Sequence, residues 1–321
     1  MTFKRKEQFG KATLYLGDSR DVLRDIPPQS VHSVVTDPPY SLVSIAKRFG
    51  KPNSAPSRDG DVYSRSSSGF LGQQWDTGET SFSAEFWDLV KSVLVHGGHV
   101  AAFGGTRTYH RLACAIEDAG FEIRDQLGWL YGSGFPKSHA QKEQWEGWGT
   151  ALKPSWEPIC LARKNIIGTV QKNLDEHGAG ALNIEACRIN NDWSDTDLGR
   201  WPANVAHDGS DEAISVLPEM SSTFLYCAKA SRDEREFGMG GNGKRENNHP
   251  TVKPIYLMRW LARLVTKPQG VIIDPFMGSG STGIACVQEG FEFIGIEMDE
   301  KYFDISCRRI EEATAQEIIS L

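Results

Sequence analysis

The tetrapeptide Asp37-Pro38-Pro39-Tyr40 directly follows residues 31–36, an apolar run with the length of a buried strand. The Asp37 carboxylate and the Pro38 carbonyl can each accept one hydrogen of an exocyclic NH₂ group, which would aim the nitrogen lone pair at an electrophile. Tyr40 offers an aromatic face on which a flipped nucleobase can stack. The alternative is a polyproline turn with Tyr40 packed at its rim.

A second group of residues lies near the C-terminal end of the sequence. Gly278, Gly280 and Gly283 have G-x-G-x-x-G spacing between an expected strand and an expected helix, where the backbone can approach a ligand closely. Glu297 ends the next expected strand, and its carboxylate can accept both hydroxyls of a ribose. The combination predicts a site for a nucleoside-containing cofactor rather than a packing turn alone.

Asp274 indicates which cofactor this is. A carboxylate at the lip of the glycine turn would repel a pyrophosphate, which argues against a dinucleotide. The segment Asp274-Pro275-Phe276 suits a cationic amino group, and S-adenosylmethionine carries both an ammonium and a sulfonium. Asp18 ends the first expected strand, where it could receive an adenine amine or cap the following helix.

The elements that must position these residues alternate between strands and helices, which predicts an α/β fold with a mostly parallel sheet covered on both faces. The expected strands are 11–18, 31–36, 99–103, 121–131, 156–162, 271–274 and 291–297, and residues 223–228 form a further short apolar run. The expected helices are 19–26, 84–95 ended by Gly97-Gly98, 106–120 with Thr106 as N-cap, 254–266, 281–290 and 300–313.

Two segments interrupt this alternation. Residues 41–72 are rich in Ser, Arg, Gly and Pro and predict a mobile loop. Residues 163–222 are rich in Asn, Asp and Gly, and five tryptophans lie within 145–201, which indicates either a small satellite core or a surface that meets a partner. The first segment carries the basic residues that we expect to contact phosphates: Lys47, Arg48, Lys51, Arg58 and Arg65.

The composition excludes several classes of protein. The 321 residues, 39% hydrophobic and 24% charged, are typical of a globular chain of one large or two ordinary domains. No apolar run could cross a bilayer, the N-terminal sequence is no secretory signal, and the six cysteines form no CxxC pair. We therefore expect a cytoplasmic protein with no membrane partner. The net charge of −7 comes mostly from the acidic residues 289–321, so it does not exclude a nucleic-acid partner.

Three motifs resemble those of the DNA amino-methyltransferases, which methylate adenine N6 or cytosine N4. They are Asp37-Pro38-Pro39-Tyr40, the loop from Asp274 to Gly280, and the segment Asn248-His249-Pro250-Thr251-Val252-Lys253-Pro254. Their order is that of the beta group, with the catalytic motif before target recognition and the cofactor loop last. Stretches such as WEPICLARK also look like phage or prophage enzymes, which would place the protein in a bacterial cytoplasm or a phage-infected host.

The resemblance implies a Rossmann-like S-adenosylmethionine-dependent methyltransferase fold with a circularly permuted chain. Its sheet would have seven strands, one of them antiparallel, and the strand ending at Asp18 would lie beside the strand ending at Glu297. Residues 1–162 would form the catalytic half, 163–222 a loop-rich target-recognition insertion, and 223–321 the cofactor-binding half.

The resemblance also implies roles for individual residues. The target base would be held by Asp37, Pro38, Pro39 and Tyr40. S-adenosyl-L-methionine would be bound by Asp18, Thr251, Lys253, Asp274, Phe276, Gly278, Gly280, Ser281, Thr282 and Glu297. Thr251 and Lys253 would face its carboxylate, although a helix lead-in with a solvated Lys253 is the alternative. No metal site is expected.

The expected activity is methyl transfer to adenine N6 of a base flipped out of double-stranded DNA, because Asp rather than Ser at position 37 favours adenine. A cytosine N4 enzyme, an RNA methyltransferase and a non-catalytic DNA-binding subunit of a restriction complex remain alternatives. A dehydrogenase is disfavoured by Asp274. The sequence leaves open the recognised bases, any cognate nuclease, and whether the chain is a monomer or a homodimer.

Overall fold

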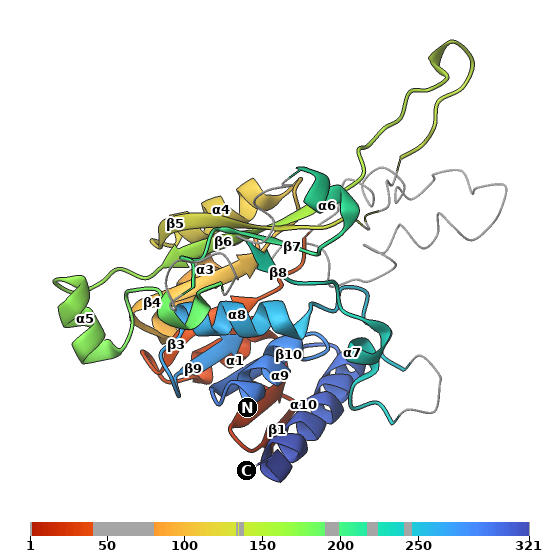
Figure 1. The fold of residues 1–321 in the computed structure, drawn as a ribbon. Helices are drawn as coiled ribbons and strands as arrows, with labels where there is room; N and C mark the ends of the chain where they lie inside the picture. Colours follow the sequence, from red (N-terminus) through yellow and green to blue (C-terminus); the bar gives the residue numbers. More distant parts are fainter. Residues whose placement is uncertain are drawn as a thin grey trace.

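The computed structural model describes residues 2–40, 80–132, 134, 138–189, 199–216, 224–240 and 246–320 (Figure 1). The predicted mobile loop 41–72 and its basic residues Lys47, Arg48, Lys51, Arg58 and Arg65 lie outside these ranges. None of the helices in the described ranges is long and apolar enough to cross a membrane.

The described strands form a single ten-stranded sheet in the order β1-β2-β10-β9-β3-β4-β6-β5-β7-β8. Strands β2, β10, β9, β3 and β4 are mutually parallel, β6 runs antiparallel to both β4 and β5, and β5, β7 and β8 are parallel. Their bounds are β1 Arg5–Phe9, β2 Ala12–Leu16, β3 Val31–Thr36, β4 Leu94–Phe103, β5 Glu122–Leu130, β6 Trp156–Arg163, β7 Val205–His207, β8 Leu225–Tyr226, β9 Val271–Asp274 and β10 Glu292–Glu297.

The seven-stranded core predicted by the resemblance is present from β2 to β5, with β6 as its antiparallel strand. The structure adds three edge strands. β1 pairs antiparallel with β2, and β7 and β8 extend the other edge beyond β5. The predicted permutation is confirmed, because β2 near the N-terminus pairs in parallel with β10 near the C-terminus.

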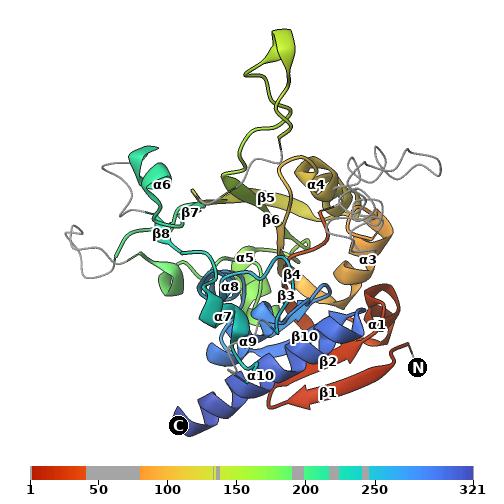
Figure 2. The same ribbon diagram turned by 90° about the vertical axis from the view of Figure 1, so that its right-hand side faces the viewer.

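Helices cover both faces of the sheet, and successive strand residues supply the two cores. Val35 packs in the core beneath α8, α9 and α10, whereas its neighbour Val34 packs in the core beneath α1, α3 and α4. These helices are α1 Ser19–Asp25, α3 Ala84–Val93, α4 Tyr109–Asp118, α8 Ile255–Val265, α9 Ser281–Gln288 and α10 Glu300–Ser320. The expected three-layer α/β architecture is thus confirmed (Figure 2).

Two predicted boundaries are wrong. Helix α4 begins at Tyr109 rather than after Thr106, because residues 106–108 form a turn that precedes it. Strand β4 begins at Leu94, directly after α3, so Gly97 and Gly98 lie inside the strand instead of separating the two elements. A side chain at Gly97 would meet Asn173, and one at Gly98 would meet the His32 carbonyl, which explains the need for glycine there.

The predicted insertion 163–222 is divided between opposite ends of the strands of the sheet. Helix α5 (Val170–His177) lies beside the start of β4, since Asn173 donates to the His96 carbonyl. Cys187, which ends the short 3₁₀ helix Glu185–Cys187, is buried against α8. In contrast, α6 (Asp211–Val216) follows β7 near the carboxyl end of β5. Residues 163–189 therefore pack against the body of the fold.

An arm, residues 138–153, projects from the body of the molecule between β5 and β6 (Figure 2). It carries a 3₁₀ helix, Glu143–Trp145, and Trp145 and Trp148 meet edge to face at its tip with half or more of their surface exposed. A further short helix, α7 (Arg232–Glu236), packs near α10, where Arg309 donates to the Glu234 carbonyl (Figure 1). Neither the arm nor α7 was predicted.

Candidate active site

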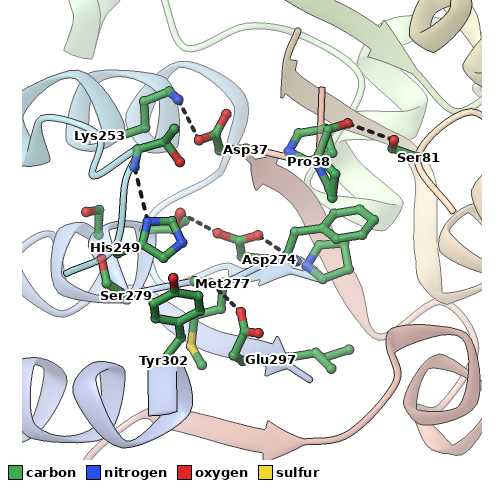
Figure 3. A pocket seen from close by; sticks show the side chains of 18 of the residues that line it. Asp37, Pro38, Ser81, His249, Lys253, Asp274, Met277, Ser279, Glu297 and Tyr302 are labelled. Carbon is green, nitrogen blue, oxygen red and sulfur yellow. Dashed lines mark hydrogen bonds and ion pairs between the residues drawn. The ribbon is translucent and has the colours of Figure 1, made fainter. Parts of the chain in front are cut away.

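A pocket of about 540 Å³ lies at the carboxyl ends of β2, β3, β9 and β10, where parallel strands bring their terminal residues together (Figure 3). The predicted catalytic motif and the predicted cofactor loop, more than 200 positions apart in the sequence, both line it. The predicted site residues found in its wall are Asp18, Asp37, Pro38, Pro39, Tyr40, Thr251, Lys253, Asp274, Phe276, Gly278, Ser281, Thr282 and Glu297.

The tetrapeptide presents two acceptors that no described residue satisfies. Asp37 Oδ1 is buried and accepts no hydrogen bond. The Pro39 carbonyl accepts from Ser81 Oγ at 2.9 Å, and the Tyr40 carbonyl accepts from Thr108 Oγ1 at 2.7 Å, whereas no described group donates to the Pro38 carbonyl. These contacts fix the backbone and leave the two predicted acceptors available to a ligand with two N–H groups.

Lys253 occupies a different place from the one expected. Its ammonium lies 2.5 Å from Asp37 Oδ2, 3.3 Å from Glu157 Oε2 and 3.2 Å from the Tyr40 hydroxyl, and the side chain is only 6% exposed. The alternative of a solvated Lys253 is therefore wrong. Lys253 instead pairs with Asp37 of the predicted catalytic tetrapeptide, which neutralises its charge.

Burial and mutual charge set the protonation of this cluster. Burial raises the pKa of Asp37 above its ordinary value, and the nearby Lys253 ammonium opposes that rise. For Lys253, burial acts to lower the pKa, but Asp37 and Glu157 together raise it. We therefore assign a charged ammonium to Lys253 at neutral pH.

Asp274 links the strands that carry the two motifs. Its carboxylate accepts hydrogen bonds from Thr36 Oγ1 and Thr282 Oγ1, each at 2.6 Å, and from the Phe276 N–H at 3.0 Å. Thr36 immediately precedes the catalytic tetrapeptide, so Asp274 holds β3, β9 and the start of α9 in register. Burial raises its pKa to about 6 despite these donors.

The glycine loop bends around the side chain of His249. Gly278 has φ of +54°, and a Cβ there would lie 2.8 Å from His249 Nε2, so no larger residue fits without movement. Glu297 accepts from the Gly278 N–H at 2.8 Å and from the Asp299 N–H at 2.8 Å. Burial raises the pKa of Glu297 to about 7.

Two predicted cofactor residues have structural roles. Gly280 lies outside the pocket wall and is the N-cap of α9, with φ of +83° and Ser306 packed against it. Asp18 caps α1 by accepting from the Arg20 N–H at 2.9 Å and also pairs with the Arg20 guanidinium, so the capping alternative is the one observed. Asp18 still lines the pocket.

The chemistry of the wall fits S-adenosylmethionine. Ser281 Oγ, at the start of α9, is buried without a hydrogen-bond partner, which makes it available to a polar ligand. Thr251 also lines the pocket, and Glu297 supplies carboxylate oxygens at the end of β10. Phe276, packed against Phe86, adds an apolar surface. The wall therefore combines acceptors for a cationic ligand with a close backbone approach at Gly278.

Several wall residues were not predicted as site residues. Glu157 is the second residue of β6 and enters the pocket because β6 runs antiparallel beside β4. Tyr131 follows β5, and Tyr302 stacks edge to face on His249 at 4.6 Å. In the sequence, Glu157 and Tyr131 stand out only as an acid and an aromatic residue at the ends of expected strands. Many surface residues have such positions, so this signal does not identify a site residue.

Comparison with known proteins agrees with this geometry. The family model of the N6/N4 DNA methylases, described as DNA methylase, matches residues 31–308. The type II methyltransferase M.HindIII of Haemophilus influenzae is 25% identical over 341 aligned positions, covering 92% of this chain and 94% of that protein. The type II methyltransferase M2.DpnII of Streptococcus pneumoniae is 24% identical, covering 94% and 90%.

A solved structure shares the fold. The PvuII DNA methyltransferase, described as cytosine-N4-specific, superposes with a TM-score of 0.52 at 16% identity, over 98% of this chain and 94% of that one. The fold and pocket thus define an S-adenosylmethionine-dependent methyltransferase. More particularly, since the family model spans most of the sequence, the chain belongs to the N6/N4 DNA methylase family.

Proposed function

We propose that this protein methylates the N6 amino group of adenine flipped out of double-stranded DNA at a specific sequence. The observation that carries the proposal is the pair of unsatisfied acceptors, Asp37 Oδ1 and the Pro38 carbonyl, at the tip of β3 beside the glycine loop. An exocyclic amino group has the two hydrogens that these acceptors require.

The residues of the chain act by positioning. Two hydrogen bonds from the amino group to Asp37 and Pro38 hold the nitrogen with its lone pair directed away from the ring. Thr108 fixes the backbone of Tyr40 by donating to its carbonyl, and the Tyr40 ring gives the base a stacking surface. Bound S-adenosylmethionine supplies an electrophilic methyl group, and Ser281, Thr251 and Glu297 line the part of the pocket that we assign to it.

Asp37 favours adenine as the target. The amino groups of adenine and cytosine present the same two hydrogens, so the acceptors alone do not distinguish the bases. The resemblance to the DNA amino-methyltransferases supports adenine, because this chain has aspartate at position 37, where related enzymes can carry serine. Cytosine N4 is the competing target.

We assign the contact with duplex DNA to the arm and α6. Tyr131 and Pro154, which flank the arm, both line the pocket, so a duplex that delivers a base to Asp37 lies at the foot of the arm. Lys153 of the arm pairs with Glu212 of α6 at 3.3 Å, which joins the two elements. Exposed tryptophans at the tip can stack on bases or pack in a groove.

The test is to incubate the purified protein with S-adenosylmethionine and DNA from a methylation-free host, digest the DNA, and identify modified nucleosides by mass spectrometry. We expect N6-methyldeoxyadenosine. N4-methyldeoxycytidine would instead identify a cytosine enzyme, and methylation of RNA but not DNA would overturn the proposed substrate. Single-molecule sequencing of DNA from the expressing host gives the sequence context.

A further inference from the structure

Glu157 is a partly buried acid that the reaction described above does not use. It comes from β6, whereas Asp37 and Tyr40 follow β3 and Lys253 precedes α8. Its Oε2 accepts from the Tyr40 hydroxyl at 3.2 Å and lies 3.3 Å from Lys253 Nζ. One oxygen of Glu157 therefore contacts both the aromatic residue and the cation of the base site.

The Lys253 ammonium makes two hydrogen bonds and one further ion-pair contact in this cluster. A lysine ammonium has three donors. Lys253 donates to Asp37 Oδ2 and to the Tyr40 hydroxyl, and Glu157 Oε2 lies 3.3 Å from the ammonium as an ion-pair partner. Because Lys253 contacts only the Oδ2 atom of Asp37, the Oδ1 atom stays without a partner. Removal of Glu157 would take away an ion-pair partner of the ammonium, and Asp37 Oδ1 is the adjacent carboxylate oxygen without a partner.

Glu157 also sets the net charge of the cluster. Two carboxylates and one ammonium leave an excess of one negative charge, whereas Asp37 and Lys253 alone would be neutral. The target nitrogen is neutral before methyl transfer and positively charged once it has formed its fourth bond, until it loses a proton. An excess negative charge in a buried site stabilises that developing cation.

We propose that Glu157 is a positioning residue for methyl transfer: it shares the Lys253 ammonium with Asp37, keeps Asp37 Oδ1 free for the target amine, and leaves the cluster negative. This inference rests on the proposed function of the pocket. Glu157 acts through Lys253, Asp37 and Tyr40 rather than through the base itself.

The surroundings of Glu157 predict how its loss changes the pH dependence. Glu157 raises the pKa of both Asp37 and Lys253, so a neutral residue at position 157 lowers both. The other titratable groups that face Glu157 are Tyr40, Tyr131 and Lys229, and none of these carries a negative charge at neutral pH that could replace it. In the pH dependence of the rate, we assign the acidic limb to Asp37 and the alkaline limb to Lys253. Both limbs should therefore move to lower pH when Glu157 is replaced by a neutral residue.

The experiment compares Glu157→Gln, Glu157→Asp and a control, Glu289→Gln, in single-turnover assays at saturating cofactor and DNA. Glu289 is a largely buried glutamate that pairs with Arg259 outside the pocket. We expect Glu157→Gln to slow methyl transfer about 10- to 100-fold with little change in cofactor or DNA affinity. Glu157→Asp, which retains the charge, should recover part of the rate and the wild-type pH limbs.

A second measurement is independent of activity. The pKa of the Lys253 ammonium, followed by ¹⁵N-lysine NMR, should fall in Glu157→Gln and stay unchanged in Glu289→Gln. An unchanged rate profile and an unchanged Lys253 pKa in folded Glu157→Gln would overturn the role of Glu157 alone. Absence of methyl transfer by the wild-type protein would overturn the proposed function and, with it, this role.

Discussion

Two regions of the molecule hold their polar and aromatic groups in different ways. One is the floor of the pocket, by which we mean Asp274 and the groups bonded to it, and the other is the arm, residues 138–153. In the floor, groups from distant segments fix one another, as when Asp274 joins Thr36, Thr282 and Phe276. In the arm, the described contacts are mostly internal: the Gln141 N–H donates to the Trp148 carbonyl, and Trp145 packs on Trp148. The floor therefore has a fixed geometry, whereas the arm presents exposed aromatic side chains to solvent.

This difference separates two kinds of residue. Positioning of reacting atoms demands groups held to within fractions of an ångström, which only a packed surrounding supplies. Contact with a long duplex instead requires reach and exposed stacking surface. We therefore expect floor variants to change the rate of transfer or the stability, and arm variants to change DNA affinity.

The largest effect should come from Asp37→Ala. Loss of a positioned acceptor should lower the single-turnover rate by about 10³-fold or more, while cofactor affinity remains within about threefold of wild type. Tritium transfer to DNA and calorimetry measure the two quantities. The control is Asp21→Ala, an exposed aspartate that pairs with Arg24 on α1. Equal turnover by the Asp37 and Asp21 variants would remove Asp37 from the reaction.

An intermediate effect should follow from the buried acid Glu297. Its folded-state pKa of about 7 lies above the ordinary 4.5, so its contribution to stability is complete below pH 4.5 and is lost as the pH rises through 7. Wild type should lose up to about 3 kcal/mol of unfolding free energy over this window that Glu297→Gln does not lose. Urea unfolding at pH 4.5 and pH 8 measures the difference, and parallel curves for both proteins would contradict it.

A smaller effect should come from the arm. Replacement of Trp145 and Trp148 by alanine should raise the dissociation constant for DNA about 30-fold or more, because each stacked aromatic contributes about 1–3 kcal/mol. Fluorescence anisotropy measures binding, and the rate at saturating DNA and the melting temperature should stay unchanged.

The control for the arm is Trp201→Ala, which removes an exposed tryptophan, outside the pocket wall, that packs near Arg188. Trp201 belongs to the predicted insertion 163–222. If its loss weakens DNA binding as much as loss of the arm tryptophans, the insertion and not the arm contributes the main DNA contact.

The sequence predicts the core of the fold because its elements have strong local signals. Apolar runs such as 31–36 and 271–274 are bounded by Pro and Gly, and the motifs directly follow them, so the pocket wall could be predicted largely from strand ends. The edge strand β1 was missed because the exposed, alternating sequence Arg5–Phe9 has little apolar content.

The pairing of Lys253 with Asp37 and Glu157 could not be predicted in this way. It depends on the register of β6 against β4 and on the path of the chain before α8, neither of which has a local signal. The same reason applies to the arm, which has no periodic apolar pattern. Residues fixed by tertiary contacts between distant segments are the ones that the sequence left undecided.

The parallel pairing of β2 with β10 has a consequence for biosynthesis. The Gly17 N–H donates to the Glu297 carbonyl, so the part of the pocket between β2 and β10 closes only after residue 297 has left the ribosome. A nascent chain holds its catalytic tetrapeptide early but gains the opposing loop last. Because long-range pairing of this kind forms slowly in general, we expect the pocket to be completed late in folding.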